Sequence, residues 1–169
     1  MSVTQLQTLT SSGGLANVGI DQIYTTGKTY YVDSNNGNAT NNGLTPAQAV
    51  TTLALAAALT AANKGDIIFL MPGHAETLTA SLSISTEGIS VIGLGVGDNR
   101  PVITFGTSTA ADITLAADNI SIKNVIFKND IDAQVNVIDV QKAYCSIVNC
   151  EMWEGTAKQF LIGISLSAT

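Results

Sequence analysis

The amino-acid sequence predicts an all-β protein, a parallel β-helix (a solenoid of stacked coils) with an N-terminal capping α-helix. Three observations predict this fold. Hydrophobic residues make up 46% of the 169-residue chain but aromatic residues only 5%, which favours thin, regularly stacked strands over a bulky globular core. The second half of the chain repeats short aliphatic strands, and too few residues lie between them for crossover helices. A single helix-forming segment precedes the repeats.

The repeat is visible as three segments that align without a gap. "LSISTEGISVIGLGV", "ITLAADNISIKNVIF" and "IDVQKAYCSIVNCEM" begin at residues 82, 113 and 138. Each unit is expected to form one β coil, with inward side chains stacked in columns. The expected columns are Leu82/Ile113/Ile138, Ile84/Leu115/Val140, Ile89/Ile120/Cys145, Val91/Ile122/Ile147, Leu94/Val125/Cys150 and Val96/Phe127/Met152. Extended chain from Cys145 to Cys150 spans roughly 16 Å, too far for a disulfide without a tight turn between them, so we expect both as reduced, small apolar side chains.

The glycine-rich stretch "VIGLGVGDNR" is either a phosphate-binding loop or a bend. In the alignment Gly93 coincides with Asn124 and Asn149, and Gly and Asn are the residues that accept left-handed backbone. No GK[ST] follows the glycines, and Pro101 precedes any helix-forming segment. The pattern therefore predicts a recurrent bend between two short strands, not a nucleotide site.

The remaining sequence predicts an arm and a capped domain. Residues 1–27, which contain "SSGG", are expected to form a polar N-terminal arm, and residues 28–169 the β-helix domain. Within the domain we expect a capping helix over about 46–63 and repeating coils from about 66. Thr45 followed by Pro46 indicates where the helix begins.

No cap corresponding to this helix is apparent at the C-terminal end of the repeats. "ISLSAT" at residue 164 begins a further unit. An uncovered edge strand invites pairing. We therefore expect either further chain or another subunit to cover this end.

The charge and the apolar pattern of the sequence argue against two classes of partner. The chain has a net charge of −6, one arginine (Arg100) and no basic run, so nucleic acid is not an expected partner. No apolar stretch is long enough to span a membrane, and the N-terminus lacks the basic and apolar regions of a secretory signal. A membrane partner is therefore not expected either.

The order of motifs resembles a known class of proteins. "YYVDSNNG", "NGLTP", the helix segment, "GDIIFLMPG" and "ISVIG" follow one another as in the N-terminal half of right-handed parallel β-helix proteins of the pectin-lyase-like class. "MPGHAET" followed by "GLGVGDNRP" resembles structural proteins of tailed bacteriophages. The resemblance spans roughly residues 22–155 and implies a right-handed β-helix. This fold serves lyases, hydrolases, tailspikes and capsid decorations alike.

Residues with metal-binding chemistry are few. His74 is the only histidine, and no Cys-His spacing completes a metal site, so we expect a polar residue at a strand end. "DSNNGNATNNG" from Asp33 resembles the start of a calcium loop, but Asn38 and Leu44 stand where an EF-hand loop needs Gly and Glu. A turn-rich surface loop is expected there, with a loose oxygen-ligand site as the alternative. Neither a cofactor nor a metal ion is expected.

The candidate catalytic residues are two acids. Asp130 and Asp132 lie two residues apart, as a pair of carboxylates for glycoside cleavage would require. They are the catalytic candidates only if the protein is an enzyme. Arg100, a possible base in lyase chemistry, is expected to contact Asp98 within its turn.

Candidate interface residues lie at both ends of the chain. The alignment places Met152 inward and Trp153 outward, and an outward indole indicates a subunit contact. Glu151, Trp153 and Glu154 are alternatively a platform of an aromatic ring and acids for stacking sugars. Leu15 and Val18 are the candidates in the arm.

These observations lead to one main functional hypothesis and two alternatives. The resemblance implies a non-enzymatic virion structural protein of a tailed phage, a capsid decoration or fibre-like subunit. As such it would form a homotrimer on the capsid exterior and bind the major capsid protein through its arm. The first alternative is a carbohydrate-active β-helix protein, either a polysaccharide lyase or hydrolase or a tailspike. The second is a bacterial surface-layer or adhesin-like repeat protein.

Overall fold

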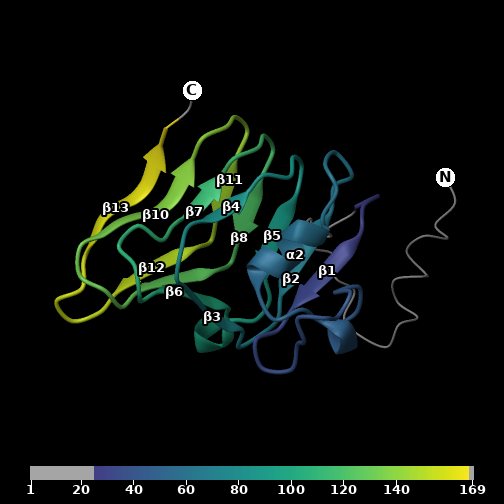
Figure 1. Cartoon of the computed structure of the whole chain (residues 1–169), viewed down its shortest axis with the longest axis horizontal. Helices are drawn as coiled ribbons and strands as arrows, with labels where there is room; N and C mark the ends of the chain where they lie inside the picture. The colour runs from purple at the N-terminus through teal and green to yellow at the C-terminus, as the bar shows by residue number, and fades with distance from the viewer. Residues whose placement is uncertain (1–24, 168–169) are drawn as a thin grey trace, which may run out of the picture.

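The computed structural model describes residues 25–167, which form a parallel β-solenoid (Figure 1). The chain visits three parallel sheets in turn. Sheet A contains β1 (Thr29–Val32), β2 (Ile67–Leu70), β5 (Ser90–Gly93), β8 (Ser121–Lys123) and β11 (Ser146–Val148). Sheet B contains β3 (Ala75–Leu78), β6 (Val102–Phe105), β9 (Ile126–Asn129) and β12 (Glu151–Glu154). Sheet C contains β4 (Leu82–Ile84), β7 (Ile113–Leu115), β10 (Gln134–Val140) and β13 (Phe160–Leu166). The predicted all-β parallel β-helix is confirmed.

The strand registers confirm the columns predicted for sheets A and C. Leu82, Ile113 and Ile138 pair in successive strands of sheet C, one residue to each coil. In sheet A, Val91 pairs with Ile122, which pairs with Ile147. Inward side chains of the middle coils are almost wholly buried, because each lies between its counterparts in the coils on either side.

One predicted column is wrong. Met152 pairs with Phe127 as predicted, but the partner of Phe127 in the preceding coil is Ile103 and not Val96. Val96 lies in an exposed loop that joins β5 to β6 and contains the 3₁₀ turn η2 (Gly97–Asn99). This loop makes the connection from β5 to β6 longer than the corresponding connection from β8 to β9, so a gapless alignment loses register after Gly93.

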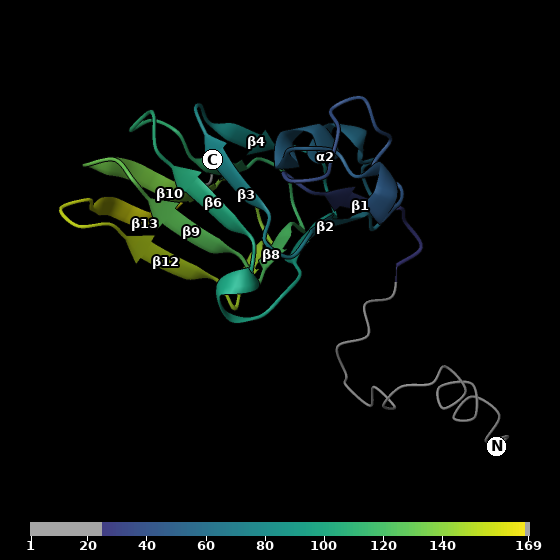
Figure 2. The ribbon, with the colours of Figure 1, turned by 90° about the horizontal axis from the view of Figure 1, so that it is seen from below.

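The capping helix is shorter than predicted. The α-helix α2 covers Leu53–Leu59, whereas Pro46–Gln48 form only a 3₁₀ turn, η1. Thr52 caps α2, since its side chain accepts a hydrogen bond from the Leu55 N–H. The segment between η1 and α2 is extended instead, because Val50 in this segment pairs with Val32 of β1. The helix packs against β1, β2 and β4 at one end of the solenoid (Figure 2).

Asparagine side chains hold the bend between sheets A and B. Asn124 and Asn149 adopt left-handed backbone with φ of 57° and 53°, as the alignment with Gly93 predicts. The Asn124 amide donates to the carbonyls of Gly93 at 2.8 Å and of Gly95 at 3.1 Å. Asn149 donates to the Asn124 amide oxygen at 2.8 Å, so the two amides form a ladder.

Candidate functional site

The two ends of the solenoid differ in how they are covered. At the N-terminal end, the edge of β1 that does not pair with β2 is hydrogen-bonded to a loop of the chain itself. The Tyr31 N–H donates to Gly43 O at 2.7 Å, Val50 N–H to Tyr31 O at 3.0 Å, and Asp33 N–H to Val50 O at 2.9 Å. Together with α2, this loop closes the N-terminal end of the solenoid.

The opposite end, which we call the end face, is not covered by any described residue. Its backbone consists of β11, β12 and β13, which are the last described strands of sheets A, B and C (Figure 1). The inward side chains of these strands complete it. The change along one column is large: Ile138 is 0% exposed, whereas Ile164, its partner in β13, is 44% exposed. Leu166, which pairs with Val140, is 80% exposed. Large apolar side chains that point inward, in line with the buried core of the preceding coils, are therefore exposed to solvent here.

Met152 and Trp153 lie on opposite faces of β12, as predicted. Met152 pairs with the buried Phe127, and Trp153 pairs with Lys128 on the outer face of sheet B. Both are more than a third exposed. Met152 thus belongs to the end face, and Trp153 to the adjoining outer surface. The other two interface candidates, Leu15 and Val18, lie outside the described residues.

Trp153 is held in place by a relay of polar contacts. Its indole N–H donates to Glu151 Oε2 at 3.0 Å, and Arg100 Nη2 contacts Glu151 Oε1 at 2.6 Å. Arg100 in turn donates from Nε to Gly97 O at 3.2 Å. The hydrogen bond from Arg100, followed by that from Trp153, holds the pKa of Glu151 below its ordinary value.

The expected turn contact between Arg100 and Asp98 is wrong. The guanidinium pairs with Glu151 instead, because coiling brings the β5–β6 loop against β12, two coils further along the chain. This pair could not be found by reasoning from the sequence, since the two residues are far apart in the chain and no local motif links them.

His74 is the centre of a buried polar cluster next to the cap. It directly precedes β3 and is completely buried. Its Nδ1 accepts a hydrogen bond from the Ser34 N–H at 3.0 Å, so the ring proton lies on Nε2, 3.3 Å from Glu76 Oε2. The same Glu76 oxygen accepts from the Leu53 N–H at the start of α2, at 2.8 Å. His74 therefore joins the turn before β3 to the loop that closes the N-terminal end. It lies at a strand end as predicted, but the sequence did not indicate its burial or its partners.

The loop from Asp33 forms turns. The Asp33 carboxylate accepts from the backbone N–H groups of Asn35 and Asn36 at 2.8 and 3.1 Å, and from the Asn36 side chain at 3.0 Å. Burial raises the pKa of Asp33, but these hydrogen bonds outweigh it and leave the pKa below its ordinary value. In residues 25–167, no three His, Cys, Asp or Glu side chains lie close enough together to hold a metal ion.

Asp130 and Asp132 lie in the turn between β9 and β10. Both side chains are exposed. Neither carboxylate makes a hydrogen bond or an ion pair to another described residue.

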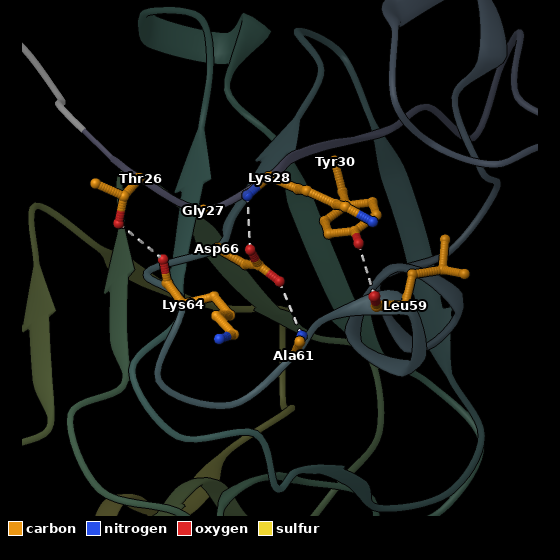
Figure 3. Close-up of a pocket in the computed structure, with 8 residues that line it drawn as sticks. All are labelled: Thr26, Gly27, Lys28, Tyr30, Leu59, Ala61, Lys64 and Asp66. Atoms are coloured by element: carbon orange, nitrogen blue, oxygen red, sulfur yellow. Dashed lines mark hydrogen bonds between the residues drawn. The ribbon is translucent and has the colours of Figure 1, made fainter.

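A pocket of about 370 Å³ lies where the chain enters β1 (Figure 3). Several of its polar groups are hydrogen-bonded within the protein itself. The buried Asp66 accepts from the Lys28 N–H at 2.6 Å and the Ala61 N–H at 2.8 Å, and the Tyr30 hydroxyl donates to Leu59 O at 2.7 Å. Burial, followed by the charge of Asp66, raises the pKa of Tyr30. The phenol therefore joins β1 to the end of α2, and the carboxylate joins the residue before β1 to the segment after α2.

Cys145 and Cys150 are free thiols on the last coil, as predicted. Burial raises the pKa of Cys150, so its thiol is a poor nucleophile at neutral pH. None of the helices in residues 25–167 has both the length and the apolar character needed to cross a membrane.

Comparisons of the chain with protein families, with curated protein sequences and with solved structures gave no match. The functional argument therefore rests on the chain's own residues and on their arrangement.

Proposed function

We propose that the protein is a non-enzymatic structural subunit of a tailed-phage virion, a capsid decoration or a fibre-like component on the outside of the shell. The observation that carries the proposal is the apolar surface of the last described coil, where Tyr144, Val148 and Trp153 are 82%, 48% and 39% exposed. Exposed apolar side chains of this kind suit a protein that assembles with other proteins. The phage origin rests on the motif resemblance alone.

The proposed partners are the major capsid protein and further copies of the chain. We propose that residues 1–27 bind the shell, because this segment contains one charged side chain, Asp21, and the apolar interface candidates Leu15 and Val18. Self-association as a homotrimer is part of the same proposal. Apolar surface on the last coil, including the outward Trp153, supports it.

Deletion of residues 2–20 tests the role of the arm. The truncated chain should keep the circular dichroism and melting temperature of the parent but no longer co-sediment with shells of the phage that encodes it. A matched control replaces the same residues by a Gly/Ser segment of equal length, which should fail to bind in the same way. Full shell occupancy by the truncated chain would contradict the proposed role of the arm.

Carbohydrate cleavage is the competing function, and the exposed Asp130 and Asp132 are the residues to test for it. The proposal predicts no release of reducing ends or unsaturated uronates from polygalacturonate or from host capsular polysaccharide, with or without Ca²⁺. Activity above background that disappears in both Asp130→Asn and Asp132→Asn would replace the structural proposal by the enzymatic one.

A further inference from the structure

We propose that one water molecule is bound inside the solenoid, between the amide side chains of Asn129, Gln134 and Asn136. The site lies at the corner between sheets B and C, where the chain passes from β9 to β10. The water joins the two ends of the turn that carries Asp130 and Asp132. The inference is independent of the proposed function, since it concerns the interior of the solenoid.

Three buried polar atoms at this corner have no hydrogen-bond partner among the described residues. They are Asn129 Nδ2, Gln134 Oε1 and Asn136 Oδ1. The side chains of Asn129 and Gln134 lie within the core, since both residues are 0% exposed. A buried polar atom without a partner is unfavourable, because it has lost its hydrogen bonds with solvent and gained none in the protein. The three atoms therefore call for a polar ligand.

Neighbouring contacts determine which atom of each fully buried amide is free. Gln134 Nε2 donates to the carbonyl oxygens of Ala111 and, at 2.8 Å, of Asn136, so the free atom is Oε1. Asn129 Oδ1 accepts a hydrogen bond from the Ile131 N–H at 3.1 Å, so the free atom is Nδ2. Exchanging nitrogen and oxygen in either amide would lose these bonds, because an amide oxygen cannot donate and an amide nitrogen does not accept. The site thus presents both a donor and an acceptor.

Two phenylalanine rings show that the amides border the same part of the core. Asn129 pairs with Phe105 of the coil before it, and Gln134 pairs with Phe160 of the coil after it. The Phe105 and Phe160 rings meet edge to face, with their centroids 6.3 Å apart. Asn136 lies two residues after Gln134 on β10, so the two side chains point to the same face of the strand. Described residues therefore enclose the site on both sides.

The polarity of the three free atoms selects water over an ion. Asn129 Nδ2 is a donor, whereas Gln134 Oε1 and Asn136 Oδ1 are acceptors. A water molecule can accept one hydrogen bond and donate two, and buried waters typically make about three. A cation would face the Asn129 amide hydrogens, and an anion would face two amide oxygens. Water satisfies all three atoms at once.

A crystal structure of the full chain tests the site directly, and water magnetic relaxation dispersion tests it in solution. The crystal structure should show one ordered water within about 3.2 Å of all three atoms. Relaxation dispersion counts long-lived internal waters, and Asn129→Leu should lose one of them, because it removes the donor and places apolar atoms in the site. Ile138→Val is the matched control: Ile138 is buried on the same strand β10, and its substitution removes no polar atom, so the count should stay that of the parent.

Circular dichroism establishes that each variant is folded. If Asn129→Leu does not fold, Asn136→Leu takes its place, because Asn136 is only partly buried and tolerates change more readily. The inference is overturned if the crystal structure shows the amides bonded directly to one another or a metal ion between them. Equal numbers of long-lived waters in the parent and the leucine variant would overturn it as well.

Discussion

Ile122 provides the strictest test of the solenoid, because its side chain lies in the middle of an inward column. It is 1% exposed and pairs with Val91 on one side and Ile147 on the other. Removal of its side chain in Ile122→Ala should cost about 2–5 kcal/mol. Ile122→Asp also buries an unpaired carboxylate, which adds several kcal/mol. The sum is comparable with the whole stability of a typical domain, about 5–15 kcal/mol.

The neighbouring residue on the same strand supplies the control. Lys123 is exposed and points outward, so Lys123→Asp should change the free energy of unfolding by about 0.5 kcal/mol or less. Ile122→Val, which removes one methylene group, should cost about 0.5–1.5 kcal/mol. The expected order of destabilisation is therefore Asp, Ala and Val at position 122, followed by Asp at position 123.

Urea unfolding followed by circular dichroism and by tryptophan fluorescence measures this order. Trp153 is the only tryptophan of the chain and lies on the next coil, so it reports on the structure beside the substituted column. If Ile122→Asp unfolded at the same urea concentration as the parent, Ile122 would not be buried inside a coil, and the reasoning would be refuted.

Three further predictions concern polar residues. Asn124→Ala should lower the free energy of unfolding by about 1–3 kcal/mol, because the Gly93 and Gly95 carbonyls lose their hydrogen-bond donor. Thermal unfolding measures this loss. Asn124→Gly removes the same donor but accepts the left-handed backbone, so it separates the loss of the hydrogen bonds from backbone strain. The hydrogen bond from Ser165, with those from Gln141 and Ser167, outweighs the effect of burial and lowers the pKa of Asp139. The Asp139 carboxylate should therefore stabilise the fold fully above the unfolded carboxyl pKa of about 4. This contribution to the free energy of unfolding should be lost as the pH falls through the lower pKa of the folded state. Melting temperatures measured between neutral and acid pH should therefore fall less steeply for Asp139→Asn than for the parent. Arg100→Met should raise the pKa of Glu151 and lower the fluorescence anisotropy of Trp153; unchanged values of both would show that the relay does not hold the indole.

The parts of the fold that the sequence predicted are those in which one coil repeats the next. Columns such as Leu82/Ile113/Ile138 follow from spacing alone, because parallel strands of equal coils meet in register. The same logic failed at Val96, where an added loop breaks the spacing before the next strand begins.

The helix shows a different limit of the sequence. Thr45 and Pro46 are residues that commonly begin a helix, yet the segment after them pairs with β1 through Val50 instead. Long-range pairing thus overrode a local preference, and only Leu53–Leu59 remained helical.

The candidate site was predicted in part. The opposite facing of Met152 and Trp153 follows from strand alternation, and the structure confirms it. The contact of Arg100 with Glu151 and that of His74 with Ser34 depend on how coils and loops stack. Both pairs join residues far apart in the chain, so neither spacing nor a motif indicated them.

The measurement that tests the central claim most directly is the number of copies of this chain in purified particles of the phage that encodes it. Quantitative peptide mass spectrometry of gradient-purified virions measures this number against the major capsid protein. A structural subunit should be present at a fixed ratio to the capsid protein, unchanged by further rounds of purification. Absence from the particles, or a ratio that falls towards zero as purification proceeds, would contradict the account.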